Sequence, residues 1–284
     1  VHTNYKNIVV GNGSTELISL FIQITHPMKA LIVGPTYSEY EREVAMGGGR
    51  SHYFSLTEAS EFELDTKALT EELSANVDLL ILCNPNNPTS SVIKRQQMRE
   101  ILDYCKRKSI TVLVDETYVE FAEEPDEVTA IPLTEYYNNI VILRGISKFF
   151  AAPGLRLGYA ICGNRDLLNE INQKKNPWTI NSLAAIAGEI MFQDEDYIKK
   201  TRELISSERA RICARLDESP NFKVYHAHAN FDKFTSEDAF DACIRKNLMI
   251  RDCSTFPFLN NKYIRLCFMM PEQNDALLEV LLGL

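Results

Sequence analysis

Paired cysteines are missing from this sequence. No two cysteines form a Cys-x-x-Cys pair, and their number is odd, so the set excludes a disulfide framework and a zinc-ribbon type of site. We predict reduced, mostly buried thiols in a cytoplasmic protein. His226 and His228 could form a metal pair, but no further Cys or His cluster stands at ligand spacing, and we predict no metal site. The cysteines are Cys83, Cys105, Cys162, Cys213, Cys243, Cys253 and Cys267.

Long apolar runs and an excess of basic residues are missing as well. No run approaches the ~18 apolar residues that a membrane span requires, and the first residues show no signal-peptide pattern. The 30 basic residues are outnumbered by 39 acidic ones, which gives a net charge of −9. This balance disfavours nucleic acid and anionic membranes as partners, but it permits a local basic pocket for a small anion.

Two nucleotide-binding motifs are incomplete. Gly11 and Gly13 begin a Gly-x-Gly pattern, but its third glycine would fall at Glu16. Asp115 and Glu116 end an apolar run, as in a Walker B element, yet no G-x-x-x-x-G-K-[ST] loop accompanies them. Neither dinucleotide nor NTP binding is therefore predicted.

The remaining composition is that of an ordinary globular protein. The chain has 284 residues, of which 45% are hydrophobic and 24% charged, enough for a large domain with or without a small one. Apolar strand-like runs alternate with amphipathic helical segments, which predicts an α/β fold with a mainly parallel sheet. The sequence begins with Val1-His2-Thr3 rather than with methionine. We expect that it is a fragment or that its ends were left out.

The most informative stretch runs from Ser147 to Gly158. It places Lys148 and Arg156 eight residues apart between two apolar runs. Phe149 and Phe150 follow the lysine, and we expect their apolar surroundings to disfavour its charged form and make it a nucleophile toward a carbonyl. Arginine is suited to clamp a phosphate. The pair suggests a cofactor that carries both an aldehyde and a phosphate.

Further polar residues follow the other predicted strands. Tyr37 comes after the apolar run 30–33, and Asp115 ends the run 110–114. The loop 84–89, Asn-Pro-Asn-Asn-Pro-Thr, follows the run 77–83 and exposes amide groups. Open α/β sheets bind ligands at the carboxyl ends of their strands, where these residues would meet. The turn 11–15 opens a helix predicted from Glu16 and offers free N–H groups to an anion.

Together these motifs resemble those of a known family. In chain order they are Gly-Asn-Gly-Ser-Thr (11–15), Pro-Thr-Tyr (35–37), Asn-Pro-Asn-Asn-Pro-Thr (84–89), Asp-Glu-x-Tyr (115–118), Ser-Lys (147–148), Gly-x-Arg-x-Gly (154–158) and Ile-Arg (264–265). They resemble the pyridoxal-phosphate (PLP) enzymes of fold type I, aminotransferase class I and II. The resemblance is greatest to the branch of histidinol-phosphate aminotransferase and threonine-phosphate decarboxylase.

The resemblance implies a fold and a domain division. The fold would be a mainly parallel seven-stranded sheet sandwiched by helices, with a smaller α+β C-terminal domain. Residues 1–193 would form the PLP-binding domain, without the segment that precedes it in the family, and residues 194–284 the small domain. The implied dimer places that N-terminal segment over the substrate and near the partner's site.

It also implies roles for individual residues. Lys148 would form a Schiff base with PLP, Tyr37 would stack on the ring, and Asp115 would pair with the pyridine nitrogen. Asn87 and Tyr118 would bond the 3′-oxygen. The phosphate would be bound by Arg156, Ser147, Gly13, Ser14 and Thr15. Glu116 is expected to be structural. Ser90 stands where the family often has glycine, which is expected to alter the loop but not the amide.

Three residues are candidates for substrate binding. Arg265 would bind the α-carboxylate and Arg251 a distal phosphate, the alternative for each being an arginine that extends to the surface. Asn181 would either contact the substrate or begin a helix. The resulting prediction is an aminotransferase for an amino acid, a phosphorylated amino acid or an amino alcohol, with a 2-oxo acid as co-substrate. A PLP-dependent decarboxylase of the same branch and a non-catalytic PLP-binding module are the alternatives.

Overall fold

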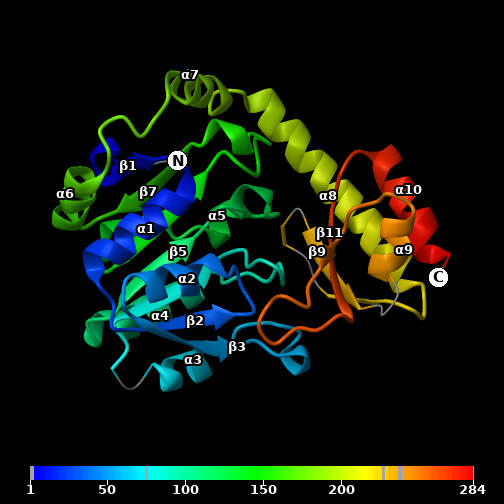
Figure 1. The fold of residues 1–284 in the computed structure, drawn as a ribbon, viewed down its shortest axis with the longest axis horizontal. Coiled ribbons are helices and arrows are strands. Elements are labelled where there is room, and N and C mark those ends of the chain that lie inside the picture. The colour runs from blue at the N-terminus through cyan, green and yellow to red at the C-terminus, as the bar shows by residue number, and fades with distance from the viewer. Residues whose placement is uncertain (1–2, 74–75, 226–227, 230, 236–238, 284) are drawn as a thin grey trace.

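Two β-sheets form the framework of the molecule (Figure 1). The computed structural model describes residues 3–73, 76–225, 228–229, 231–235 and 239–283. The seven strands of the large sheet are ordered β1-β7-β6-β5-β4-β2-β3, and the four strands of the small sheet are ordered β10-β11-β9-β8. The mainly parallel seven-stranded sheet and the second, smaller sheet agree with the predicted α/β architecture.

The large sheet is parallel except for β7, which pairs antiparallel with both β1 and β6. Strands β2 and β4–β7 are buried, mostly apolar runs, as expected when helices cover both faces of a parallel sheet, whereas the edge strand β3 is more polar and only partly buried. The strands are β1 (Ile8–Gly11), β2 (Lys29–Gly34), β3 (Arg50–Ser55), β4 (Leu79–Cys83), β5 (Thr111–Asp115), β6 (Ile140–Gly145) and β7 (Gly158–Cys162).

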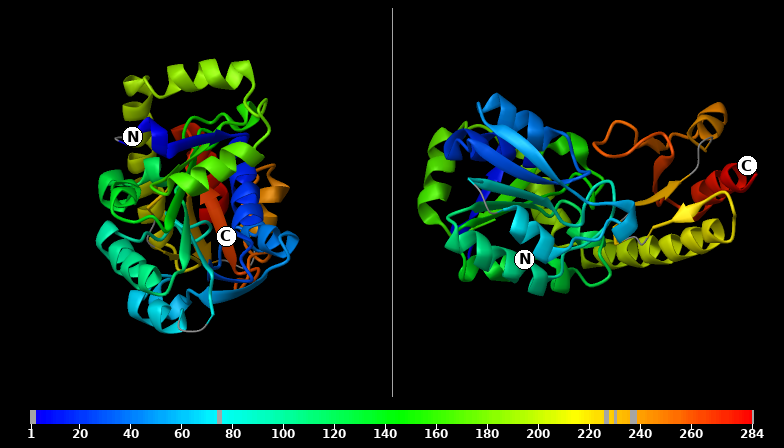
Figure 2. Two further views of the ribbon diagram at one scale, coloured as in Figure 1. Left: turned by 90° about the vertical axis from the view of Figure 1, so that its left-hand side faces the viewer. Right: turned by 90° about the horizontal axis from the view of Figure 1, so that it is seen from below.

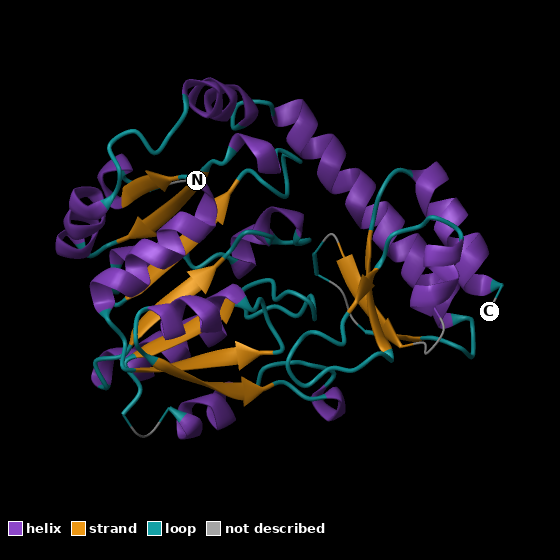
Figure 3. Ribbon diagram, viewed as in Figure 1, coloured by secondary structure: helices purple, strands orange, loops and turns teal. Residues whose placement is uncertain are grey.

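Helices cover the large sheet on both faces (Figure 3). The alternation of side chains along each strand separates two apolar cores, so that Ile32 packs with α1, α2 and α6 while Leu31 packs with α3 and α4. The helices of this part of the chain are α1 (Gly13–Thr25), α2 (Glu39–Met46), α3 (Thr66–Glu72), α4 (Arg95–Arg107), α5 (Pro125–Val128), α6 (Arg165–Lys174) and α7 (Ser182–Met191). Short 3₁₀ helices are η1 (Tyr5–Asn7), η2 (Glu58–Ser60), η3 (Val119–Phe121), η4 (Ile131–Glu135) and η5 (Pro153–Leu155).

The long helix α8 (Glu195–Asp217) leads from the large sheet to the small one (Figure 2). Ile205, Ile212 and Leu216 form its buried stripe, at the spacing of an amphipathic helix. The predicted domain boundary falls at the start of this helix, and the division into two domains stays a prediction. The rest of the chain forms β8 (Lys223–Val224), β9 (Phe231–Thr235), α9 (Ala239–Arg245), β10 (Arg251–Asp252), β11 (Tyr263–Cys267) and α10 (Pro271–Leu282).

Two local features were not predicted. Residues 231–235 form strand β9, which pairs with β8 and β11 and precedes helix α9. This pairing depends on partners distant in sequence, which local pattern does not show. The short helix α5 begins within an acidic segment, with Pro125 at its first position, where proline is well tolerated. No helix in the described part of the chain is long and apolar enough to cross a membrane.

Candidate active site

A cavity of about 400 Å³ collects residues that follow the large-sheet strands and residues of the small sheet. All the predicted site residues line it except Asn181. The lining comprises Gly13, Ser14, Thr15, Tyr37, Tyr40, Cys83, Asn87, Asp115, Thr117, Tyr118, Ser147, Lys148, Pro153, Arg156, Arg251, Phe256 and Arg265. A second cavity, of about 580 Å³, is larger and mostly apolar, but it contains none of the predicted residues. The chemistry therefore points to the smaller cavity.

Lys148 lies just beyond β6, and its side chain is exposed to the cavity. The expectation that its aromatic neighbours bury it was wrong. Phe149 is buried on the opposite side, where its ring centroid lies 5.1 Å from that of Phe121, and Phe150 stacks on Tyr197. The two phenylalanines thus stabilise the contact with α8 and leave the amine accessible.

Arg156 and the start of α1 form one anion-binding corner. The helix begins at Gly13, earlier than predicted, so Ser14 and Thr15 lie in its first turn. The Arg156 guanidinium donates to the backbone oxygens of Asn12 at 3.3 Å and Pro153 at 3.2 Å. Gly13 has a φ of +76°, and a Cβ there would lie 2.3 Å from the Arg156 Nη2. Only glycine therefore lets the guanidinium reach the helix N-terminus, where N–H groups favour an anion.

Asp115 ends β5 and is held on both carboxylate oxygens. Oδ1 accepts bonds from the Thr117 backbone N–H at 2.9 Å and its hydroxyl at 2.5 Å, and Oδ2 accepts one from Tyr40 at 2.7 Å. Burial, together with the charge of Asp115, raises the pKa of Tyr40 well above its ordinary value, so Tyr40 remains a donor. The same two causes raise the pKa of Cys83 to about 12.

Sequence reasoning missed Tyr40 and Thr117. Thr117 stands two residues after Asp115, the spacing at which an aspartate side chain commonly bonds the backbone, so a local signal existed. Tyr40 lies on α2, far from Asp115 in sequence, and its contact depends on the packing of that helix.

The three asparagines of the loop 84–89 have different tasks. Asn84 exchanges two hydrogen bonds with the backbone of Ile93, and Asn86 accepts one from Thr36, so both stabilise the loop itself. Asn87 faces the cavity, where its Oδ1 accepts a hydrogen bond from Arg265. Its amide nitrogen is the group that can donate to a ligand.

Ser90, just after the loop 84–89, has an unusual backbone conformation and a buried hydroxyl that accepts two hydrogen bonds. Its φ is +60°, a conformation that favours glycine. The serine is fully buried, and its hydroxyl accepts hydrogen bonds from the backbone N–H groups of His228 at 3.0 Å and Ala229 at 2.8 Å. The serine hydroxyl therefore connects the loop to the segment before β9.

Tyr37 and Tyr118 both line the cavity. The Tyr37 ring is partly exposed and meets Tyr40 edge-on, with 5.5 Å between centroids. Burial raises the pKa of Tyr37 and of Tyr118, so both hydroxyls remain protonated and can donate.

Arg265 and Arg251 come from the small sheet, where they are paired directly across β11 and β10. Arg251 donates to the Thr255 hydroxyl at 2.9 Å, and its guanidinium lies 5.4 Å from the centroid of the Phe256 ring. Among the lining residues of this cavity, four are cationic, whereas Asp115 is the one carboxylate. Such an environment favours a ligand with more than one negative charge.

Asn181 does not line the cavity. It caps α7, with its Oδ1 accepting from the Ala184 N–H at 2.8 Å and its Nδ2 donating to the Leu155 oxygen at 3.1 Å. This placement gives it the helix-start role, and a substrate contact stays a prediction. His226 of the predicted histidine pair lies outside the described residues, among which no cluster suited to a metal ion occurs.

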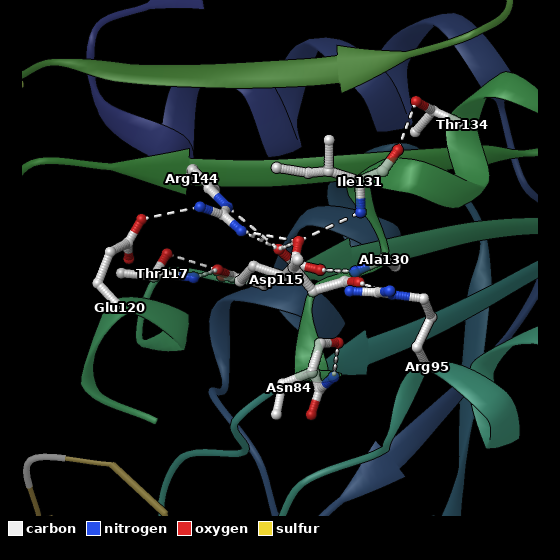
Figure 4. A network of polar contacts seen from close by, with 12 residues as sticks. Asn84, Arg95, Asp115, Thr117, Glu120, Ala130, Ile131, Thr134 and Arg144 are labelled. Atoms are coloured by element: carbon white, nitrogen blue, oxygen red, sulfur yellow. Dashed lines mark hydrogen bonds and ion pairs between the residues drawn. The ribbon is translucent and has the colours of Figure 1, made fainter. Parts of the chain in front are cut away.

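A buried network of ion pairs and hydrogen bonds lies at the ends of β5 and β6 (Figure 4). The Glu116 carboxylate accepts from the Arg144 guanidinium at 2.7 Å and from the Ala130 N–H at 2.6 Å. Arg144 also donates to Glu120 at 3.0 Å. Glu116 is fully buried and absent from the cavity lining, which matches the structural role expected for it.

Comparisons with known proteins place the chain in a family. Residues 1–281 match the family model of aminotransferase class I and II. The chain is 34% identical over 284 residues to a putative threonine-phosphate decarboxylase of Caldanaerobacter subterraneus subsp. tengcongensis, covering 98% of this chain and 77% of that protein. It is 34% identical over 286 residues to a histidinol-phosphate aminotransferase of Clostridium kluyveri, covering 98% and 78%.

A solved structure agrees. The crystal structure of the histidinol-phosphate aminotransferase from Clostridium acetobutylicum matches with a TM-score of 0.91 at 30% identity, covering 98% of this chain and 83% of that one. The chain belongs to aminotransferase class I and II. It is an enzyme of this class, and its cofactor is PLP. The cavity fits that cofactor, because it combines an accessible amine, an anion-binding corner and a buried carboxylate held on both oxygens.

Proposed function

We propose that this enzyme is an aminotransferase for a phosphorylated amino acid or amino alcohol, with a 2-oxo acid as the second substrate. The observation that carries the proposal is the pairing of Arg265 and Arg251 on adjacent strands, both of them lining the cavity. Two guanidinium groups on one side of a site match a substrate with two anionic groups. Arg265 takes the α-carboxylate of the amino acid or of the 2-oxo acid, and Arg251 takes the distal phosphate.

The remaining lining residues hold and orient the cofactor. When bound, PLP supplies an aldehyde and an electron-accepting ring. Arg156, Ser147 and the first turn of α1 bind its phosphate. Asp115 keeps the pyridine nitrogen protonated, and Tyr37 packs on the ring face. The Asn87 amide and the Tyr118 hydroxyl donate to the 3′-oxygen.

Lys148 is the catalytic base in this proposal. Its amine lies at the end of β6 facing the same cavity as Arg265. There it takes the proton from the substrate Cα and returns a proton during transamination. Arg265 holds the carboxylate, so that the Cα–H bond faces the amine.

Decarboxylation is the second candidate, because a relative named threonine-phosphate decarboxylase is as similar as the aminotransferase. The two reactions differ in which bond at Cα is broken, and therefore in how Arg265 orients the carboxylate. Incubation with phosphorylated amino acids and 2-oxoglutarate separates them: glutamate indicates transamination and CO₂ decarboxylation. Formation of neither contradicts both. Borohydride reduction followed by peptide mass analysis should locate the cofactor on Lys148 and find no adduct in Lys148→Ala.

Assembly and location complete the proposal. We propose a homodimer, which is supported by apolar side chains exposed along α7. These are Leu183 (72% exposed), Ile186 (58%) and Ile190 (63%). Sedimentation analysis tests the assembly. The cysteines that the structure describes form no disulfide, which supports the cytoplasm as the compartment.

A further inference from the structure

Glu58 connects the edge of the large sheet to two strands of the small sheet. It lies in η2, directly after the edge strand β3. Its Oε1 accepts hydrogen bonds from the Tyr225 hydroxyl at 2.7 Å and the Lys223 ammonium at 3.0 Å. Its Oε2 accepts one from the Tyr263 hydroxyl at 2.9 Å. One carboxylate thus binds residues of β8, of the position just beyond it, and of β11.

The backbone around Glu58 is shaped to make this contact. Glu61 and Phe62 have φ values of +53° and +62°, which non-glycine residues rarely adopt. The turn places the buried Phe62 ring edge-on to Tyr225, with 5.4 Å between centroids, and to Tyr263, with 6.0 Å. Glu58 and Phe62 therefore hold the same two tyrosines. Glu58 binds the tyrosine hydroxyls, and Phe62 packs against the tyrosine rings. Strained backbone of this kind persists where the surrounding contacts require it.

The contact is linked to the substrate side of the cavity through β11. Tyr263 and Arg265 are two residues apart on this strand, so their side chains leave the same face about 7 Å apart. Arg265 donates a hydrogen bond to Asn87 in the cavity, and Arg251 on β10 is paired directly with Arg265. The strand is thus attached to the large-sheet side at Tyr263, outside the cavity, and at Arg265, inside it.

A bound substrate should affect the contact of Arg265 with Asn87 but not the contact of Tyr263 with Glu58. A carboxylate that takes Arg265 competes with Asn87 for its N–H groups. The contact between Glu58 and Tyr263 is not part of the cavity lining and is unaffected by that competition. It therefore still attaches β11 to the large-sheet side when a substrate is bound.

We propose that Glu58 is a positioning residue for substrate binding, which holds β11 so that Arg265 and Arg251 face the cavity. The inference rests on the proposed function, in which Arg265 binds the substrate carboxylate. Hydrogen bonds from Tyr225, Lys223 and Tyr263 lower the pKa of Glu58 to about 2, so the carboxylate is ionised at neutral pH. The residues assigned to PLP come from the large-sheet side, and a change at Glu58 should leave cofactor binding unaltered.

Steady-state kinetics of Glu58→Ala test the inference against a matched control. The control is Glu123→Ala, which removes the ion pair between Glu123 and Arg209 of α8, 2.8 Å long. This ion pair also connects the large-sheet side to the C-terminal part of the chain, but it does not involve β11. We expect Glu58→Ala to raise the KM for the amino acid about tenfold with kcat changed less than about threefold, since binding is lost without loss of chemistry. Glu123→Ala should leave both constants unchanged. Equal KM values in the two variants would overturn the inference.

A binding measurement provides a readout that needs no turnover. 3-Phosphoglycerate carries a carboxylate and a phosphate and has no amine. Calorimetry with the PLP-loaded protein should find its Kd raised in Glu58→Ala and unchanged in Glu123→Ala. If Glu58→Ala fails to fold, Tyr263→Phe removes only the hydroxyl on β11 and should raise the same Kd and KM to a smaller extent. An unchanged Kd in the folded variant contradicts the inference.

Arg265→Lys separates failure of the inference from failure of the proposed function. If Arg265→Lys raises the KM and Glu58→Ala does not, only the positioning role is wrong. If Arg265→Lys leaves the KM and the Kd unchanged, Arg265 does not bind the carboxylate, and the positioning role is refuted along with that assignment.

Discussion

The hydroxyl of Tyr40 donates to the Oδ2 of Asp115 at 2.7 Å, while Thr117 occupies Oδ1. A helix of one face of the large sheet thereby holds the carboxylate at the end of its central strand β5. Both contacts lie within the cavity lining, so the orientation of Asp115 is set before any ligand enters.

Tyr40→Phe should disturb this carboxylate without altering substrate binding. We expect kcat to fall about ten- to a hundredfold, since one charge-assisted hydrogen bond of about 1.5–3 kcal/mol is lost. The KM for the amino acid should stay unchanged, because Arg265 is untouched. Thr117→Val, which keeps the backbone N–H donor, should lower kcat less. A Tyr40→Phe enzyme with wild-type kcat, alongside an inactive Asp115→Ala, would show that the tyrosine does not orient the carboxylate.

Substitutions of Ser90 should separate backbone strain from hydrogen bonding. Ser90→Ala leaves the N–H groups of His228 and Ala229 without this acceptor while keeping a side chain at φ +60°, and we expect a loss of about 1–3 kcal/mol in the free energy of unfolding. Ser90→Gly loses the same acceptor but relieves the backbone, so it should cost less. Urea unfolding of the two variants measures the difference. Equal losses would mean that the positive φ carries no strain.

Removing one partner of the buried ion pair should be costly. Arg144→Met leaves the fully buried Glu116 without its counter-charge, and we expect a loss of about 3–5 kcal/mol in stability. The double variant Arg144→Met/Glu116→Gln should recover part of that loss, because the buried charge is removed as well. Thermal unfolding checks both. A double variant less stable than Arg144→Met would show that Glu116 does not depend on this arginine.

The contribution of Glu58 to stability should depend on pH. Its pKa is lowered to about 2 in the folded protein, against about 4.3 in an unfolded chain. The stabilisation is therefore present above the unfolded value and is lost as the pH falls toward 2. Because the side chain is 49% exposed, we expect Glu58→Gln to cost only about 0.5–1 kcal/mol at pH 7.

Urea unfolding at neutral and acidic pH tests this dependence. The difference between wild type and Glu58→Gln should shrink between about pH 4.3 and pH 2. Glu61→Gln, at an exposed neighbouring position, serves as the control. A difference for Glu58→Gln that does not change with pH would mean that its charge contributes nothing to the fold.

Much of the site could be predicted because its residues follow strands. Tyr37, Asn87, Asp115 and Lys148 each come shortly after an apolar run, and parallel strands bring their carboxyl ends to one edge of a sheet. Strand order was not needed for that prediction. Gly13 and Arg156 joined the set through the family pattern, and the close approach between them is the physical reason for the glycine.

The orientation of side chains could not be read in the same way. The aromatic neighbours of Lys148 suggested a buried amine, but Phe149 and Phe150 pack toward α8. Strand β9 was missed because its partners are distant in sequence. Asn84 and Asn86 looked equivalent to Asn87 until the loop's own hydrogen bonds distinguished them.

The sequence by itself determined the α/β alternation, the residues at the strand ends and the chemistry of an amine beside a phosphate clamp. These depend on local pattern and on the common direction of parallel strands. Tertiary structure alone decided that Tyr40 holds Asp115, that Ser90 bonds the segment before β9, and that Glu58 binds the strand of Arg265. Each of these contacts joins residues far apart in the chain, and only the packing of helices and sheets brings them within hydrogen-bond distance.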